Sequence, residues 1–161
     1  MGLVFDASSL IILDSVGLLG KICATDLQLI VPKVVSVREV NSEYFSKKVL
    51  DGRFQVLEPP TDLFPFDLRP GLGDGEIAVI ALVLKEPQHW AVLDDFRGRN
   101  VARLLNVRFL GTARLVKYLI DKGMLGNVSV PGILYEMKNA GFHIDEETIL
   151  RVMKEPILDL G

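Results

Sequence analysis

The stretch that decides the fold is Leu3-Val4-Phe5-Asp6-Ala7-Ser8-Ser9-Leu10, an apolar run that ends in an aspartate and passes into a helical pattern. A short apolar run bounded by small polar residues is typical of a buried strand. Asp6 therefore falls at the C-terminal end of a strand, which is the edge where open α/β sheets bind ligands. The structural alternative, which this stretch alone favours, is that Asp6 only caps the following helix.

Short apolar runs alternate with longer helical patterns along the rest of the chain, which is typical of βαβ units and a mostly parallel sheet. Strands are predicted at residues 3–5, 27–31, 55–57, 91–93 and 108–110. Helices are predicted at residues 8–19, 32–49, 74–85, 97–105, 112–122, 132–140 and 145–154. The sequence thus predicts one α/β domain over residues 1–161, with residues 124–161 as a C-terminal helical extension.

Several residues mark the predicted helix ends. Pro32 suits the first turn of a helix, Asp74 and Thr112 are candidate N-caps, and Gly123 follows a helix that ends in lysine. The segment 58–75 is rich in Pro and Gly and predicts a long irregular connection, a class of loop that is often functional.

The composition limits the classes of protein that the chain can belong to. Its 161 residues suit one domain, and 49% hydrophobic residues exclude a disordered chain. The longest apolar stretches, such as residues 77–84, fall short of the ~20 residues of a membrane-spanning helix. No basic leader with a cleavage site precedes the first strand, so a cytoplasmic location and no membrane partner are expected. The single cysteine, Cys23, excludes an internal disulfide.

Charge is distributed unevenly along the chain. The formal net charge is −3, but residues 96–122 carry +6 and the remainder −9. A basic band on an acidic body suits an enzyme that holds phosphates locally, and Arg97, Arg99 and Arg103 are the candidate nucleic-acid contacts. The alternative is a pair of amphipathic helices with solvated outer faces.

A second strand also ends in carboxylates, because Asp94 and Asp95 directly follow the apolar residues 91–93. If the strand order reverses between this strand and the first one, their acids face one crevice at the topological switch point. Two further acids are candidates. Glu39 lies on the same helical face as Val35, and Glu76 lies in the first turn of an apolar helix, where the helix dipole favours a negative charge. Each has a structural alternative: an ion pair for Glu39 and a routine first-turn acid for Glu76.

The chain resembles the PIN-domain superfamily, in particular the prokaryotic branch related to the VapC-type toxin ribonucleases. The matching pieces span nearly the whole chain in the family's order. They are residues 4–11, residues 31–35 leading to Glu39, residues 73–78, residues 92–95 with Arg99 behind them, residues 107–112, and residues 113–125.

The resemblance implies a three-layer α/β/α sandwich with a parallel five-stranded sheet of order 3-2-1-4-5. It also implies a cluster of acids that holds Mg²⁺ or Mn²⁺, with Ser8 as a hydroxyl near the first Asp and Thr112 at the edge of the site. The chain has Leu93-Asp94-Asp95 where many relatives have Thr-Asn-Asp, and position favours Asp95 over Asp94 as a ligand. The implied catalytic set is Asp6, Glu39, Glu76 and Asp95, and the implied metal ligands are Asp6, Glu76, Asp95 and Asp94.

Four carboxylates in one place repel each other, and a hard dication with oxygen ligands offsets that repulsion. The predicted function is therefore a divalent-metal-dependent endoribonuclease that hydrolyses phosphodiester bonds in RNA. The resemblance adds the toxin of a toxin–antitoxin pair, a cognate antitoxin and a homodimer. The alternatives are a non-catalytic nucleic-acid-binding or scaffold module and, with less support, a phosphatase that uses Asp6 as nucleophile.

Overall fold

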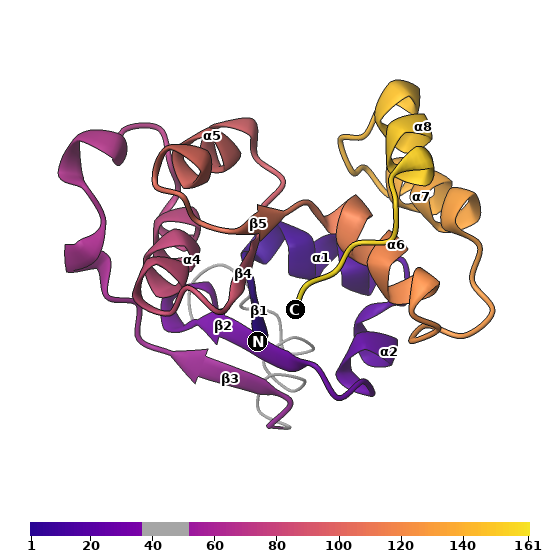
Figure 1. The fold of residues 1–161 in the computed structure, drawn as a ribbon, viewed down its shortest axis with the longest axis horizontal. Helices are drawn as coiled ribbons and strands as arrows, with labels where there is room; N and C mark the ends of the chain where they lie inside the picture. The colour runs from indigo at the N-terminus through magenta and orange to yellow at the C-terminus, as the bar shows by residue number, and fades with distance from the viewer. Residues whose placement is uncertain (37–51) are drawn as a thin grey trace.

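The protein is seen here in a computed structural model that describes residues 1–36 and 52–161, and a five-stranded parallel sheet runs through its centre (Figure 1). The strand order is β3-β2-β1-β4-β5, and every neighbouring pair is parallel. The strands are β1 (Gly2–Phe5), β2 (Gln28–Pro32), β3 (Phe54–Leu57), β4 (Trp90–Val92) and β5 (Phe109–Leu110). This order confirms the predicted α/β fold and places the topological switch point between β1 and β4.

Helices cover both faces of the sheet. The α-helices are α1 (Ala7–Ser15), α2 (Leu19–Cys23), α4 (Asp74–Lys85), α5 (Phe96–Leu104), α6 (Thr112–Asp121), α7 (Val130–Asn139) and α8 (Glu146–Lys154). Two short 3₁₀ turns, η2 (Thr61–Leu63) and η3 (Phe66–Leu68), interrupt the connection between β3 and α4. Figure 1 shows α4 and α5 on one side of the sheet and α1, α6 and the C-terminal helices on the other.

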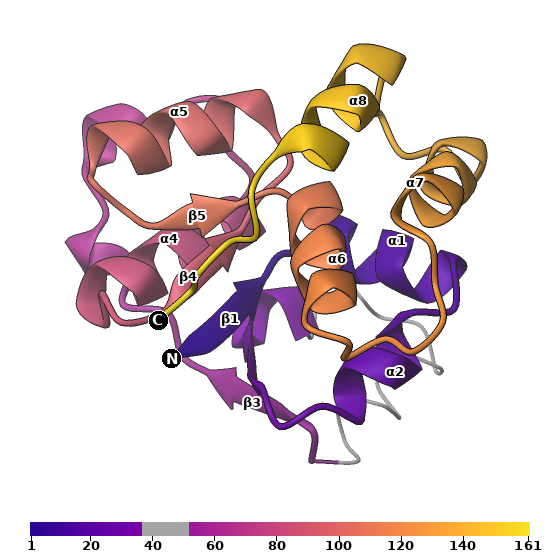
Figure 2. The same cartoon turned by 45° about the vertical axis from the view of Figure 1, so that its right-hand side comes forward.

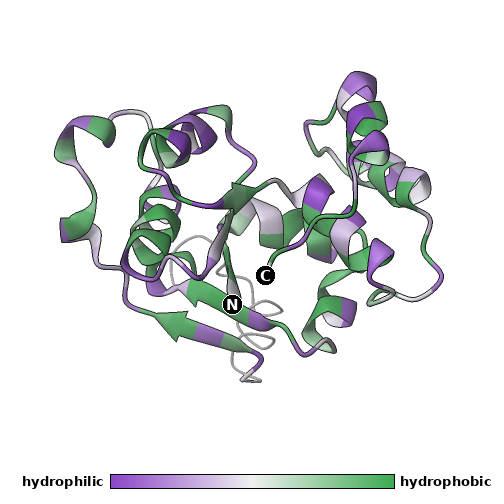
Figure 3. Cartoon of the chain, in the orientation of Figure 1, coloured by the Kyte–Doolittle hydropathy of each residue, from purple (hydrophilic) through white to green (hydrophobic). Residues whose placement is uncertain are grey.

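The side chains of β1 show how the sheet divides the core, because successive residues of a strand point to opposite faces. Leu3 and Phe5 belong to the cluster that contains buried residues of α1, α2, α6, α7 and α8. Val4 belongs to the second cluster, which is formed with α4 and α5. In Figure 3 the central strands are mostly green, as expected of strands buried on both faces.

The C-terminal helices are part of the larger cluster rather than a detached appendage. Met137 of α7 and Ile149 of α8 are fully buried in it. The chain then returns to the sheet, where the indole Nε1 of Trp90 donates to the carbonyl oxygen of Leu160 at 3.1 Å. Figure 2 shows this last segment running from α8 toward the start of β1. Among the described helices, none has the length and apolar character needed to cross a membrane.

The prediction of one helix over residues 8–19 was wrong, because α1 ends at Ser15 and α2 begins at Leu19. The break is a Schellman motif centred on Gly17, whose φ of 71° suits glycine. Gly17 N donates to Asp14 O at 2.9 Å and Leu18 N donates to Leu13 O at 2.8 Å. Gly123 ends α6 with the same pattern, as the sequence predicted.

Two other helix starts differ from the prediction. Pro32 is the last residue of β2, and helical residues begin one position later, at Lys33; residues 37–49 of the helix predicted there lie outside the described part of the chain. The N-caps of α4 and α6 are Gly73 and Gly111, one residue before Asp74 and Thr112. Asp74 and Thr112 are instead the first helical residues, and the Thr112 hydroxyl donates to Asp94.

Candidate active site

Asp6 lies where β1 meets α1, at the edge of the sheet predicted from the sequence. Its residue surface is 4% exposed, and it is the N-cap of α1. Oδ1 accepts from the Ser9 backbone N–H at 2.9 Å and from the Ser9 hydroxyl, while Oδ2 accepts from the Ser8 hydroxyl at 3.0 Å. Asp6 therefore does cap α1, mainly through Oδ1, while Oδ2 accepts from the exposed Ser8.

Asp94 follows β4 and is held by a residue 18 positions further along the chain. The Thr112 backbone N–H donates to Asp94 Oδ1 at 2.8 Å, and the Thr112 hydroxyl donates to Oδ2. Thr112 itself is fully buried at the start of α6. Because its two donors face one carboxylate, Thr112 fixes the orientation of the Asp94 side chain.

Asp6 and Asp94 form one electrostatic unit. Phe5 is paired in register with Val92, so the two aspartates follow neighbouring strand ends at the switch point. Burial raises the pKa of Asp6 above its ordinary value, despite the hydrogen bonds from Ser9 and Ser8. Burial also raises the pKa of Asp94 to about 6; the charge of Asp6 adds to this, while the bonds from Thr112 and the charge of Arg99 oppose it. At neutral pH two poorly solvated carboxylates thus oppose each other.

Glu76 and Asp95 form a second pair of carboxylates, which lie next to each other at Gly98. Glu76 Oε2 accepts from the Gly73 backbone N–H at 2.8 Å, and Asp95 caps α5 by accepting from the Gly98 N–H at 2.9 Å. A Cβ placed on Gly98 would lie 3.4 Å from Glu76 Oε1 and 3.9 Å from Asp95 Oδ2. Both carboxylates therefore border Gly98, and backbone donors at helix starts stabilise their charges.

The four described acids separate into these two pairs. Within residues 1–36 and 52–161, no group of three or more His, Cys, Asp or Glu side chains is close enough to hold one metal ion together. Glu39, the remaining predicted acid, lies outside the described residues. The donor chemistry of Asp6 and Asp94 nevertheless fits a hard divalent cation, since both offer carboxylate oxygens and both are disfavoured as bare anions.

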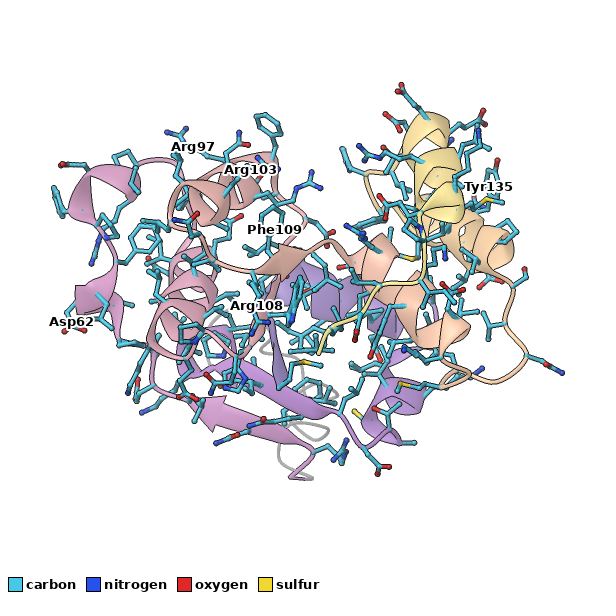
Figure 4. The ribbon with its side chains drawn as sticks, viewed as in Figure 1. Asp62, Arg97, Arg103, Arg108, Phe109 and Tyr135 are labelled. Atoms are coloured by element: carbon cyan, nitrogen blue, oxygen red, sulfur yellow. The ribbon has the colours of Figure 1, made fainter. Side chains whose placement is uncertain are left out.

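The predicted nucleic-acid contacts have different surroundings. Ser8 is exposed beside Asp6, and Arg99 lies near Asp94, as its effect on that carboxylate indicates. Arg103 stacks over Phe109, with its guanidinium carbon 5.5 Å from the ring centre (Figure 4). Arg97, by contrast, packs over Gly71, whose φ of 81° brings the loop backbone close to the guanidinium. Only Arg99 and Arg103 therefore face the Asp94 side.

Two contributors were missed in the sequence. Ser9 supplies both a backbone and a hydroxyl donor to Asp6, and its signal was the Asp-x-x-Ser spacing of an N-cap. Gly111 allows the close approach of Asp94, since a Cβ there would lie 3.2 Å from Asp94 Oδ1. No local pattern could have identified Gly111, because its neighbour comes from a different strand.

A parallel sheet of this order, with paired acids at its switch point, defines an α/β protein of nuclease-like architecture. A family model described as a PIN domain matches residues 2–156, and the chain belongs to the PIN-domain family. Membership confirms the resemblance to the PIN-domain superfamily, while the relation to the VapC-type branch stays a prediction. PIN domains generally use Mg²⁺ or Mn²⁺ and commonly bind nucleic acids. No curated protein shows significant sequence similarity to the chain.

Proposed function

We propose that this protein is a divalent-metal-dependent ribonuclease that hydrolyses phosphodiester bonds in RNA, with Asp6 and Asp94 as the primary cation ligands. The observation that carries the proposal is the pair of carboxylates at the switch point: desolvation raises the pKa of both, and the charge of Asp6 adds to the rise at Asp94. Among the described residues, neither carboxylate forms an ion pair with a side chain of opposite charge. Carboxylates whose burial costs stability without such a partner are typical of a functional site.

In this proposal the residues of the site have separate roles in binding the cation and in orienting its ligands. Asp6 and Asp94 would hold Mg²⁺ or Mn²⁺, and binding would displace the proton that Asp94 partly retains near pH 6. Thr112 and Ser8 would keep the carboxylates oriented. When bound, the cation supplies Lewis-acid stabilisation of the charge that develops on the phosphoryl group.

In this proposal Glu76 and Asp95 have a secondary role, and Glu39, which lies outside the described residues, is a further candidate ligand. Gly98 is buried between Glu76 and Asp95, and a Cβ there would lie in contact with Glu76 and near Asp95. We place this pair second because helix-start N–H groups already stabilise both charges.

Cleavage by the wild type and by the Asp6→Asn variant tests the proposal. A fluorogenic single-stranded RNA is incubated with Mg²⁺ or Mn²⁺, and the wild type is expected to cleave it and to stop on addition of EDTA. Asp6→Asn keeps an N-cap acceptor and should lose at least about 100-fold in rate, since a ligand charge is removed. Lys85→Gln, on the far end of α4, is the matched single-charge control. A wild type that cleaves no RNA with either metal, although it is folded, contradicts the proposal.

The second candidate function is a non-catalytic RNA-binding module. The observation that favours it is that the described acids form two pairs rather than one cluster of three. The same assay separates the two candidates, because the module would retain RNA with unchanged affinity in Asp6→Asn and would release no product.

The narrower role of a toxin rests on the resemblance to the VapC-type ribonucleases. It predicts that expression of the wild type arrests growth, that Asp6→Asn does not, and that a cognate antitoxin restores growth. Arrest by both proteins would show that cleavage is not the cause and would remove the toxin role.

A further inference from the structure

A cavity of about 360 Å³ lies between α5, the start of α6 and α8, outside the two acid pairs except for one shared wall. Figure 2 shows α8 standing beside α5 across the beginning of α6. The volume falls at the lower end of the ~300–1,000 Å³ range of ligand sites. Its walls include residues of the C-terminal helical segment, namely Phe142, His143, Thr148, Arg151 and Glu155. The segment beyond residue 124 therefore contributes directly to a surface hollow next to the candidate active site.

The cavity is rich in arginine. Arg99, Arg103, Arg114 and Arg151 line it, against only two carboxylates, Asp94 and Glu155. Glu155 is already engaged, because its Oε2 lies 2.7 Å from Arg114 Nε. The positive charge that remains sits mainly on α5 and α8, on opposite walls.

The positive charges of Arg103 and Arg151 are available to a ligand. The Arg103 Nη1 donates to the neutral amide oxygen of Asn100 at 2.8 Å. Within the described part of the chain, neither arginine makes an ion pair with a carboxylate. A guanidinium that lacks a carboxylate partner presents the planar fork of donors that matches a phosphate.

The cavity opens onto the candidate cation site, since Asp94 is part of its wall. Gly111 lies at the junction, and a Cβ there would lie 3.2 Å from Asp94 Oδ1 and 3.9 Å from Arg99 Nη1. The absence of that side chain keeps the approach between Asp94 and Arg99 unobstructed. A chain of phosphates lying in the cavity would therefore reach the acids without passing over a protein side chain at this point.

We propose that this cavity binds the sugar–phosphate backbone of single-stranded RNA, with Arg99 and Arg103 of α5 on one wall and Arg151 of α8 on the other. The inference rests on the proposed function, because it assigns the path by which the substrate strand leaves the acids. Apolar residues beside the arginines, Phe109 and Phe142, supply surface for a base or sugar. The C-terminal segment is then a substrate-binding element and not only a packing element.

Binding without catalysis tests the inference. Fluorescence anisotropy with a labelled 2′-O-methyl oligouridylate in EDTA measures affinity at several salt concentrations. Arg151→Gln and Arg103→Gln are each expected to weaken binding about tenfold, as for loss of a charged hydrogen bond. Each should also reduce the salt slope by about 0.7, the value for one single-strand phosphate contact. Lys154→Gln, which removes the same charge from α8 outside the cavity, should change affinity less than twofold.

Equal behaviour of Arg151→Gln and Lys154→Gln, in variants whose melting temperatures match the wild type, overturns the inference. So does an oligoglutamate peptide that binds as tightly as the RNA and competes with it, because that outcome assigns the cavity to an acidic peptide. The assay needs no metal and no cleavage. Loss of RNA cleavage with this binding intact counts against the proposed function alone, and normal cleavage with binding insensitive to Arg151 and Arg103 counts against the cavity alone.

Discussion

The two acid pairs beside the switch point differ in how their surroundings in the fold affect the negative charge of the carboxylates. Glu76 and Asp95 accept from backbone N–H groups at helix starts, so the fold stabilises their charges. Asp6 and Asp94 also accept hydrogen bonds, but burial outweighs those bonds and the pKa of each is raised. All four acids accept from backbone N–H groups at helix starts, and Asp6 caps α1 as Asp95 caps α5, so capping alone does not separate the pairs. The pair with raised pKa values costs stability in the absence of a ligand, and this difference locates the functional centre at Asp6 and Asp94.

The largest expected effect is on RNA cleavage. Asp94→Asn should reduce the Mg²⁺- or Mn²⁺-dependent rate by about 100-fold or more, because it removes a ligand charge. Asp95→Asn, its neighbour and matched control, should reduce the rate less than about tenfold, since Asn also caps helices well. The rates are measured with one RNA under saturating metal. Equal losses in the two variants would make the pairs equivalent and end the distinction drawn between them.

The free energy of unfolding, measured in EDTA, should depend on pH because of the raised pKa of Asp94. Asp94 has a folded pKa of about 6 and an unfolded pKa of about 3.9, so the folded state binds more protons between these values. Stability contributed by this group is therefore lost as pH rises from about 4 to about 6, and it stays low above that. The Asp94→Asn variant has no carboxyl group to ionise at this position, so it avoids this loss of stability. It should be about 2 kcal/mol more stable than the wild type at pH 7.5.

Urea unfolding of both proteins at pH 4.5 and 7.5 measures this difference. It should shrink to about 1 kcal/mol or less at pH 4.5, where the folded wild-type carboxyl is largely protonated. An Asp94→Asn variant that is less stable than the wild type at pH 7.5 contradicts the assignment.

The smallest expected effect concerns the second pair. Gly98→Ala places a methyl group at ordinary contact distance from Glu76 and Asp95, at 3.4 and 3.9 Å. Because Gly98 is helical, the substitution should raise stability by about 0.5–1 kcal/mol and leave cleavage within about twofold. Thermal unfolding and the cleavage assay measure the two quantities. A tenfold loss of cleavage would show that substrate or cation occupies the space between these acids.

Much of the fold could be predicted from the sequence, and the reasons are local. Each buried strand is a short apolar run bounded by polar or turn-forming residues. Gly123 marks the end of α6 as expected. Gly17 gives the same signal but lies inside an apolar helical pattern that continues into α2, so the break there was missed. The strand order came from the family resemblance, since spacing alone does not determine which strands are neighbours.

The candidate site was less predictable for a physical reason. Asp94 and Asp95 are adjacent in sequence, and the backbone turns between them from the end of β4 into α5. That turn directs Asp94 to Thr112 and Asp6, while Asp95 caps the next helix. The position of Asp95 in the family motif favoured it as the ligand. Desolvation and the hydrogen bonds from Thr112, 18 residues away, favour Asp94 instead. Contacts between distant parts of the chain cannot be read from either aspartate alone.

Metal titration tests the central claim most directly. Calorimetry of Mn²⁺ binding to the wild type, Asp94→Asn and Asp95→Asn, in two buffers of different ionisation enthalpy, gives affinity and proton release together. The account predicts that the wild type binds Mn²⁺ and releases protons at pH 6, that Asp94→Asn weakens binding about 100-fold, and that Asp95→Asn weakens it less than about tenfold. Loss of binding in Asp95→Asn with binding retained in Asp94→Asn would contradict it.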